Sequence, residues 1–533
     1  MIKLIQSFRT INWFFITLIC FVLVLPFSEA LVSIFGGVLL FTALTEDTVQ
    51  NKLARLRKNR VLLLIPAIYM IYLLSAFVSN NLFSSLYDLR KCLFFLIIPV
   101  AFIFGKNISG YQKRLLFYSF SFAVLIASLV ALIRYFIPGS EISYDIRNIS
   151  LISHIRFSFQ LILAFWFFIM IIYKNYYILN NYLLAAAIVI AMYFLSFILF
   201  QHSLTGLFIL ITSILFFMFF VILRTDPKKR RILLTIASLL IIVSIGYVSW
   251  IVIKFYDIEE VNEQSFDLET RQGNPYKHDL DNFMVENGRY VYLYVCEEEL
   301  REEWNKISEY KYDSTGQNGF PVHSTLLRYM TSKGLRKDAH GVRKLNENDI
   351  QNIEKGIANV IYQNKKFSLY PRIYETVWEF YVYTKTGYAN NHSLSQRIEF
   401  AKAALTIIRK NFWFGVGTGN WKEEFKKAYI DNNSKLNEEH YASSHNQYLN
   451  YLVKFGLTGF LIISFLLIGP IIVTKRYRDI FFMLFLVFMF FANFADSNFE
   501  SHMGSSFFLF FYCVFLITNG TNYLIISQNT RNR

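Results

Sequence analysis

Hydrophobic residues gather in twelve runs that are separated by polar loops of very unequal length. As α-helices these runs would cross, or nearly cross, the hydrocarbon core of a bilayer, which is about 30 Å thick. The runs are 11–27, 30–44, 61–78, 92–105, 115–137, 155–173, 182–200, 203–223, 231–253, 448–473, 479–495 and 505–526. The pattern predicts an all-α polytopic membrane protein with about twelve transmembrane helices, of which the second and fourth are short.

Composition supports this class, because 54% of the residues are hydrophobic, 18% are aromatic and only 17% are charged. A single soluble core is improbable for 533 residues of this composition. The runs divide the chain into three regions. We expect nine transmembrane helices in 1–253, a large polar loop in 254–447 and three further helices in 448–533.

The positions of Lys and Arg predict the topology, because short loops rich in cations stay in the cytoplasm. With the N-terminus inside, the predicted cytoplasmic loops contain Lys52, Arg55, Arg57, Lys58, Arg60, Lys106, Lys113, Arg114, Arg224, Lys228–Arg231, Lys475, Arg476 and Arg478. The short loops on the opposite side carry few cations, namely Arg90, Lys91 and Arg147. Both termini are therefore expected in the cytoplasm, and the large loop is expected outside it.

The net charge of +15 also reflects the predicted topology, because the cations lie mainly in the expected cytoplasmic loops. The loop at 254–447 holds 26 Lys and Arg against 28 Asp and Glu, a net charge of −2, so the rest of the chain carries +17. Nucleic-acid binding needs a basic face on one soluble domain, and this distribution gives no support to such a partner.

The large loop is long enough to form a small domain. Alternating residues predict a strand at 288–296, followed by a charged helix at 297–306. Segments 324–331 and 349–363 also have helical patterns. We therefore expect a mixed α/β domain in the extracytoplasmic loop between the ninth and tenth transmembrane helices.

A further helix is predicted near 394–410, where apolar residues recur at helical spacing, and we expect it to lie along the membrane surface. Arg397 falls in its first turn, close to the positive end of the helix dipole, which is unfavourable for a cation. Either a bound anion or acidic partner compensates, or Arg397 is solvated and pairs with Glu399 or a lipid phosphate.

Three alternating glycines follow in Phe414-Gly415-Val416-Gly417-Thr418-Gly419-Asn420. Consecutive amides in such a segment can bind phosphate, but no strand precedes them and the spacing differs from a dinucleotide motif. A tight turn is the favoured interpretation.

His445 lies where the polar loop meets the next apolar helix. The unpaired amides and positive dipole end of a first helical turn disfavour imidazolium, so the ring is kept neutral and can accept a proton. The alternative is an interfacial residue that caps the helix or extends toward the headgroups.

Taken together, three motifs resemble the O-antigen ligase and polymerase family. They are Arg397-Ile398-Glu399-Phe400, the glycine segment 414–420, and His445-Asn446-Gln447-Tyr448-Leu449 leading to Gly456-Leu457-Thr458-Gly459. The resemblance is strong over 395–465, and the helix count extends it loosely over the chain. The segments Asp496–Phe508 and His154–Ser158 also resemble parts of the family, whereas Gln201 stands where many relatives have an arginine.

The resemblance implies a membrane-embedded glycosyltransferase of the GT-C-like architecture, inverting, metal-independent and without a cofactor. The implied donor is a glycan on undecaprenyl diphosphate, and the acceptor is lipid A core, protein or another glycan. The implied location is the bacterial cytoplasmic (inner) membrane, among membrane lipids, with the active site facing the periplasm.

Site residues follow from the resemblance together with the chemistry. We expect His445 to remove the proton from the acceptor hydroxyl, and arginines to hold the diphosphate because a planar guanidinium binds two oxygens and stays protonated. The diphosphate candidates are Arg397, Arg156 and Arg372, and the supporting candidates are Glu500, which could orient His445 or contact the acceptor, Asn446 and Tyr448.

Other functions are open at this point. A polymerase of the same family differs from a ligase only in its acceptor, which the sequence does not separate. A transporter of lipid-linked glycans also has many helices, but we find no inverted repeat and few charges within the apolar runs. A receptor with the large loop as its binding domain is the third interpretation.

Overall fold

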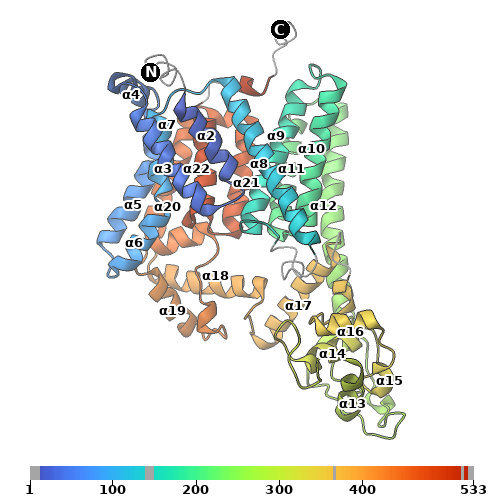
Figure 1. Ribbon diagram of the computed structural model, residues 1–533. Helices are drawn as coiled ribbons and strands as arrows, with labels where there is room; N and C mark the ends of the chain where they lie inside the picture. Colours follow the sequence, from blue (N-terminus) through green and yellow to red (C-terminus); the bar gives the residue numbers. More distant parts are fainter. Residues whose placement is uncertain (1–11, 138–148, 364–367, 518–520, 526–533) are drawn as a thin grey trace, which may run out of the picture. The chain divides into compact units, whose positions relative to one another are not determined.

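The computed structural model describes residues 12–137, 149–363, 368–517 and 521–525. The chain forms two compact units (Figure 1). Unit 1 comprises 1–233 and 397–533, and unit 2 comprises 234–396. The segment 397–447, which the sequence groups with the large loop, therefore packs with the helices of unit 1.

A helix lies at each of the twelve predicted apolar runs. These helices are α2 (Trp13–Val24), α3 (Glu29–Thr45), α5 (Pro66–Phe77), α7 (Phe94–Phe104), α8 (Gly110–Phe136), α9 (His154–Asn175), α10 (Asn181–Phe200), α11 (Leu204–Ile222), α12 (Pro227–Tyr256), α20 (Gln447–Val473), α21 (Ile480–Ala495) and α22 (His502–Leu516). Polar residues cap several of them: the side chains of Ser28, Asn180 and Ser203 each accept a hydrogen bond from a first-turn amide.

Seven helices in the described part of the chain are long and apolar enough to cross a membrane, or eight if the bent pair α3 and α4 (Val49–Lys58) forms one span. The protein is thus a mostly helical polytopic membrane protein. Several other runs give shorter helices, among them α2, α21 and α22. The full count of twelve spans stays a prediction.

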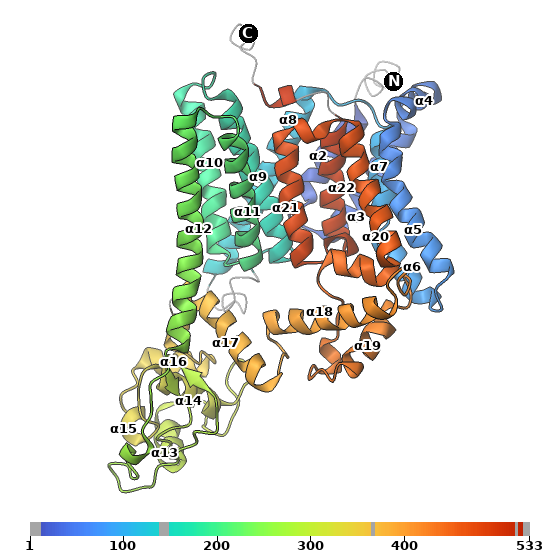
Figure 2. The same ribbon diagram turned by 180° about the vertical axis from the view of Figure 1, so that it is seen from behind.

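Helix α22 forms the centre of unit 1, since almost every side chain from Met503 to Leu516 is buried. It packs against α7, α3 and α21 (Figure 2). Aromatic contacts dominate this core: the Phe510 ring stacks on Phe21 with centroids 4.9 Å apart, and Phe511 meets Phe120 edge to face with centroids 4.8 Å apart. Outward-facing apolar side chains such as Phe41, 65% exposed, are what a lipid-facing surface requires.

Unit 1 also contains shorter elements that carry polar residues. They are η1 (Arg60–Leu64), α6 (Leu82–Lys91), the greater part of α18 (Ser393–Lys410), α19 (Trp421–Asp431), η6 (Glu438–His440), η7 (Arg476–Arg478), η8 (Asn498–Glu500) and η9 (Thr521–Leu524). The predicted helix near 394–410 is confirmed as α18. Both views show α18 and α19 across one end of the unit 1 helices (Figures 1 and 2).

Unit 2 begins within α12 and is built mainly from short helices. Its other elements are η4 (Glu263–Ser265), β1 (Val285–Glu286), β2 (Arg289–Tyr290), α13 (Glu297–Ile307), α14 (Val322–Ser332), α15 (Ala339–Val342), α16 (Glu347–Glu354), η5 (Val360–Gln363) and α17 (Tyr370–Thr386). Trp304, Tyr329 and Leu326 anchor one hydrophobic cluster, and Phe255 and Tyr374 belong to a second one.

The prediction of a mixed α/β domain needs correction. In the described part of unit 2 the only sheet is the two-residue antiparallel hairpin of β1 and β2. The strand expected at 288–296 stops after Tyr290, and Tyr294 has a positive φ of 55°, which breaks the alternation. The helix expected at 349–363 ends at Glu354, because Gly356 turns the chain with a φ of 80°.

Candidate functional site

The glycine motif and the helix after His445 form one backbone contact, which we call the glycine clasp (residues 412–419 against 453–458). Gly456 has φ 63° and ψ −171°, a conformation open essentially to glycine alone, and it interrupts α20. A Cβ on Gly456 would lie 2.3 Å from the carbonyl carbon of Trp413, and one on Gly415 would lie 2.5 Å from the amide nitrogen of Phe455. Both positions therefore require glycine.

The break at Gly456 frees backbone groups that the clasp then pairs. The amides of Val416 and Gly417 donate to the carbonyls of Val453 and Lys454 at 2.9 Å each. In the other direction, the amides of Leu457 and Thr458 donate to Phe412 and Trp413 at 2.8 and 3.1 Å. The clasp thus replaces helical hydrogen bonds that α20 loses at the break.

The amides of the glycine segment are also satisfied where it leaves the clasp. Thr418 donates to the Ser75 hydroxyl at 2.9 Å, and Gly419 donates to the Ser79 hydroxyl at 2.8 Å. Amides engaged in this way do not form an open phosphate site. The tight-turn interpretation of the three glycines is confirmed.

His445 stands one residue before the N-cap of α20, rather than in the first turn as the sequence suggested. Asn446 is the N-cap, and its side chain accepts hydrogen bonds from the amides of Tyr448 and Leu449 at 3.0 and 3.2 Å. His445 itself has a φ of 47°, an uncommon left-handed conformation for a residue with a side chain. Such strain persists where the surroundings hold it, and it is frequent at functional sites.

The ring of His445 is held between a carboxylate and an aromatic ring. Its Nδ1 lies 3.2 Å from Oδ1 of Asp496, and the ring stacks on Phe400 of α18 with centroids 5.4 Å apart. The His445 side chain is 45% exposed, so the other edge of the ring is accessible. Burial acts to raise the pKa of Asp496, but the hydrogen bond with His445, the charge of His445 and that of Arg156 lower the pKa below its ordinary value.

Asn450 fixes the backbone on both sides of this pair. The Asn450 side chain accepts from the Ser444 hydroxyl at 2.6 Å and donates to the Ser497 hydroxyl at 2.7 Å. Ser444 precedes His445 and Ser497 follows Asp496, so one buried amide couples the two segments that carry the pair. Nothing in the sequence motifs pointed to Asn450, although an amide one turn into an apolar helix is a usable signal.

Two of the predicted arginines belong to the same region. Arg397 lies one turn before Phe400 on α18, and residues three apart share a helix face, so Arg397 is on the side that meets His445. Arg156 donates to Glu29 at 3.0 Å, its buried Nε has no hydrogen-bond partner among the described atoms, and its charge acts on Asp496.

Position 201, where many members of the family have an arginine, holds a glutamine that forms structural hydrogen bonds. Gln201 accepts from Ser158 at 2.9 Å and donates to Ser150 at 2.8 Å, so it ties the start of α9 to the start of α11. Gln201 is fully buried in this role.

A buried charge cluster adjoins the glycine clasp, and we call it the ion triad: Lys454 on α20, Asp88 on α6 and Glu500 on η8. Lys454 donates to Asp88 at 2.6 Å and to Glu500 at 2.8 Å, and its side chain is only 2% exposed. Trp421 of α19 donates to Asp88 at 2.8 Å. Burial and the Asp88 carboxylate raise the pKa of Glu500, with Lys454 acting in the opposite direction.

The structure therefore gives Glu500 a different neighbour from the one the sequence suggested. The carboxylate against His445 is that of Asp496, at the end of α21. Glu500, four residues later in η8, pairs with Lys454 instead. Sequence alone does not say which of two nearby acids turns toward the histidine. Lys454, which nothing in the sequence motifs singled out, decides it by taking Glu500.

The remaining predicted residues have defined contacts. The Tyr448 hydroxyl donates to the carbonyl of Phe490 at 2.9 Å and so joins α20 to α21. Arg372 lies in unit 2 on α17, where it pairs with Glu375 at 2.7 Å. Asn446 and Tyr448 thus support the start of α20, and Arg372 belongs to the other compact unit.

The fold and this region together define a polytopic membrane protein with a histidine–carboxylate pair and at least two arginines in its helical unit. Residues 355–464 match the family model described as O-antigen ligase. The match confirms the resemblance to the O-antigen ligase family over about a fifth of the chain, including Arg372, Arg397, His445 and Gly456. A search of curated proteins gives no match. The family match indicates a ligase- or polymerase-type role in glycan processing.

Proposed function

We propose that this protein is a glycosyltransferase that moves a glycan from undecaprenyl diphosphate to lipid A core or a protein, on the outer face of the bacterial cytoplasmic membrane. The observation that carries the proposal is the His445–Asp496 pair at 3.2 Å, with an accessible ring edge on His445. The family match at 355–464 supports the glycan substrate.

His445 acts as the general base in this proposal. With Nδ1–H donating to Asp496, Nε2 carries the lone pair and takes the proton of the acceptor hydroxyl. The acceptor oxygen then bonds to the anomeric carbon, while the bond from that carbon to the diphosphate oxygen breaks. Attack from the side opposite the leaving group inverts the anomeric centre.

Arg397 and Arg156 stabilise the charge that develops on the diphosphate as it leaves. The buried Nε of Arg156 offers a donor without a protein partner among the described atoms, which suits an incoming phosphate oxygen. Glu29 neutralises Arg156 when the site is empty. Arg372 is a third candidate from unit 2.

The acceptor distinguishes the ligase from its closest alternative, a polymerase that joins one lipid-linked glycan to another. Purified protein in nanodiscs, with an undecaprenyl diphosphate-linked glycan, candidate acceptors and EDTA, tests both. Glycan on lipid A core or protein, with released undecaprenyl diphosphate, supports the ligase; longer glycan on undecaprenyl diphosphate supports the polymerase. Glycan movement across the bilayer without transfer contradicts both enzymes and favours a transporter.

The His445→Ala variant should abolish transfer in the same assay while leaving donor binding largely intact. Asp496→Asn should lower kcat by about 100-fold or more, because the asparagine no longer selects the tautomer with a free Nε2 lone pair. Asp431→Asn, at an exposed ion pair with Lys410, is the matched control. Near-normal transfer by folded His445→Ala protein would rule out the assignment of the base.

A further inference from the structure

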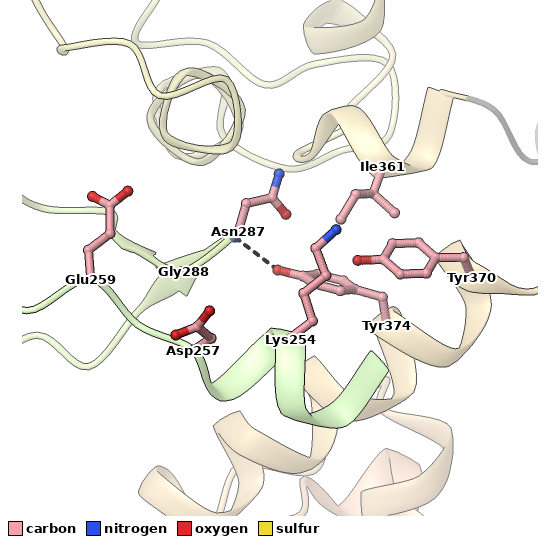
Figure 3. Close-up of a pocket in the computed structure, with 8 residues that line it drawn as sticks. All are labelled: Lys254, Asp257, Glu259, Asn287, Gly288, Ile361, Tyr370 and Tyr374. Atoms are coloured by element: carbon pink, nitrogen blue, oxygen red, sulfur yellow. Dashed lines mark hydrogen bonds between the residues drawn. The ribbon is translucent and has the colours of Figure 1, made fainter. Parts of the chain in front are cut away.

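Unit 2 contains a pocket of about 390 Å³ that none of the proposed chemistry uses (Figure 3). The end of α12, the β1–β2 turn and the start of α17 line it. The lining residues are Lys254, Asp257, Glu259, Asn287, Gly288, Ile361, Tyr370 and Tyr374. Its size is in the range of small-molecule sites.

Tyr370 and Ile361 supply the apolar side chains of this pocket, whereas the Tyr374 ring is only 2% exposed and packs beneath Tyr370. The rings of Tyr370 and Tyr374 stack with centroids 6.2 Å apart, and Trp250 lies 5.6 Å from Tyr370. A tyrosine offers a large, rigid apolar face together with a polar hydroxyl. Ligands that combine apolar C–H faces with hydroxyl groups match such a surface.

The polar groups supply both donors and acceptors. The Tyr374 hydroxyl accepts from the Asn287 amide at 3.0 Å, which leaves its own proton to donate (Figure 3). The ammonium of Lys254 contacts the rings of Trp250 and Tyr370 and forms no ion pair with any described residue. Asp257 adds a carboxylate acceptor. A ligand with many hydroxyl groups can use all of these.

Charge argues against a phosphate ligand. The lining has one cation, Lys254, against the two carboxylates of Asp257 and Glu259, and Glu259 pairs with Arg289 at 2.8 Å, so the pocket has no net positive charge. A diphosphate or nucleotide would meet two carboxylates without a net positive field. A purely apolar ligand would bury the ammonium and carboxylate without partners, which is costly.

A second pocket of about 300 Å³ adjoins the first, since Glu259 lines both. Its lining repeats the chemistry, with Phe266, Tyr290 and Tyr294 as aromatic residues and Arg289 and Arg336 as planar donors. The Arg336 guanidinium stacks 4.6 Å from the Tyr294 ring centroid. Two similar pockets side by side suit a chain of repeated units better than a single compact molecule.

We propose that these adjoining pockets of unit 2 bind an uncharged oligosaccharide, with the Tyr370 ring as the platform of the first sugar, the Tyr374 hydroxyl as a hydrogen-bond donor to it and the Glu259–Arg289 pair between two sugars. The saccharide class follows from the lining itself. That the saccharide is a substrate of the enzyme rests on the proposed function, and its source is either the acceptor or the glycan of the lipid-linked donor.

Saturation-transfer-difference NMR on the full protein in nanodiscs tests the binding without turnover. The probes are maltotetraose, cellotetraose and N-acetylchitotetraose, with inorganic pyrophosphate and glycerol 3-phosphate as anionic comparisons. Saturation of sugar C–H protons by at least one tetrasaccharide supports the proposal. Saturation of none, or binding of the anions alone, overturns it.

Variants place the saccharide in the pocket. Tyr370→Ala and Asp257→Asn should each weaken binding about tenfold, while Tyr370→Phe keeps the ring and most of the affinity. Tyr388→Ala and Asp281→Asn, at exposed positions of unit 2 outside both pockets, are the matched controls. Resistance of unit 2 to limited proteolysis establishes that each variant is folded. Equal losses in pocket and control variants would overturn the assignment.

The same binding should persist in His445→Ala protein, so failure of the catalytic proposal does not affect this test. If transfer is demonstrated, Tyr370→Ala should raise the KM of one substrate about tenfold with little change in kcat. A change in the acceptor KM assigns the pocket to the acceptor, and a change in the donor KM assigns it to the donor glycan. An unchanged KM for both overturns the link to the reaction.

Discussion

Lys454 of unit 1 and Lys337 of unit 2 are both buried, and they show two ways of placing an ammonium inside this protein. Lys454 in unit 1 is 2% exposed and contacts two carboxylates, Asp88 and Glu500. Lys337 in unit 2 is 4% exposed, and its described hydrogen bonds go to the backbone carbonyls of Leu293, at 2.8 Å, and Tyr290, at 3.5 Å. Carboxylates stabilise the protonated, charged lysine, whereas carbonyl dipoles stabilise it less, so the lysine can lose its proton near neutral pH.

The pKa of Lys337 shows the consequence. Burial, helped by the charge of Arg289, lowers it to about 7. In unit 1 one ammonium faces two carboxylates, and the pKa that shifts is that of a carboxylate: burial raises the pKa of Glu500. The comparison indicates that the ion triad holds α6, α20 and η8 in a fixed arrangement, while Lys337 makes the stability of unit 2 depend on pH.

The largest effect is expected from Gly456→Ala, which disrupts the glycine clasp and with it the position of Lys454. The new Cβ would meet the backbone of Trp413 at 2.3 Å in a conformation that alanine does not adopt. We expect no folded protein by size-exclusion chromatography in detergent. Gly37→Ala, where a Cβ meets nothing within 4 Å, is the control and should behave like wild type. A folded Gly456→Ala protein would show that the glycine clasp is dispensable.

Next in size is Lys454→Met, which leaves Asp88 and Glu500 buried without their cation. Breaking one side of a buried ion pair costs about 3–5 kcal/mol of unfolding free energy. Thermal unfolding in detergent should show a large loss, and transfer activity should fall with it. The triple variant Asp88→Asn, Lys454→Met, Glu500→Gln removes every charge and should recover most of the stability. If the triple variant is as unstable as Lys454→Met, packing rather than charge explains the loss.

The smallest effect, counted for a change of one pH unit, is the pH dependence of unit 2. Lys337 has a pKa of about 7 when folded and about 10.4 when unfolded, so the unfolded chain binds more protons between these values. The unfolding free energy of unit 2 should therefore rise with pH from about 7 to 10, by up to about 1.4 kcal/mol per pH unit. Hydrogen exchange of unit 2 amides measures it.

Lys337→Met is the comparison, because it removes the titrating group and nearly keeps its volume. The difference between wild type and variant cancels the contribution of other groups that titrate in this range. The variant should lose the slope that wild type shows. An equal slope in both proteins would mean that Lys337 is not the titrating group.

Much of the architecture is predictable from sequence because it depends on local patterns. The apolar runs mark helices, and α13, α14 and α18 are confirmed where helical spacing predicted them. Helix α19 was missed, and so was the amphipathic α17, although its apolar and aromatic residues at 370, 373, 374, 377, 378 and 381 follow helical spacing. The expected strand at 288–296 failed because alternation alone did not reveal the turn at Tyr294.

The candidate site was also predictable only in part: several of its residues could be named from the sequence, but their contacts could not. His445, Arg397 and Arg156 carry motifs or positions that the sequence displays, and unit 1 brings them into one region. The contacts that decide their roles span long separations: Asp496 is 51 residues from His445, and Asp88 is 366 residues from Lys454. No periodicity encodes such pairs, so tertiary structure was needed to separate Asp496 from Glu500.

The glycine clasp has a consequence for tracing distant homologues. Because backbone atoms make the contact, the clasp itself requires only that Gly415 and Gly456 remain, and it places no other constraint on the side chains of its two segments. The interval of eleven residues from His445 to Gly456 is fixed in length, because the helical turns of α20 from Gln447 onward fill most of it. Between Gly419 and His445 the chain keeps α19, whose Trp421 donates to Asp88, whereas the loop after α19 can vary in length. A search profile for such proteins should allow a variable gap there and hold the histidine–glycine interval constant.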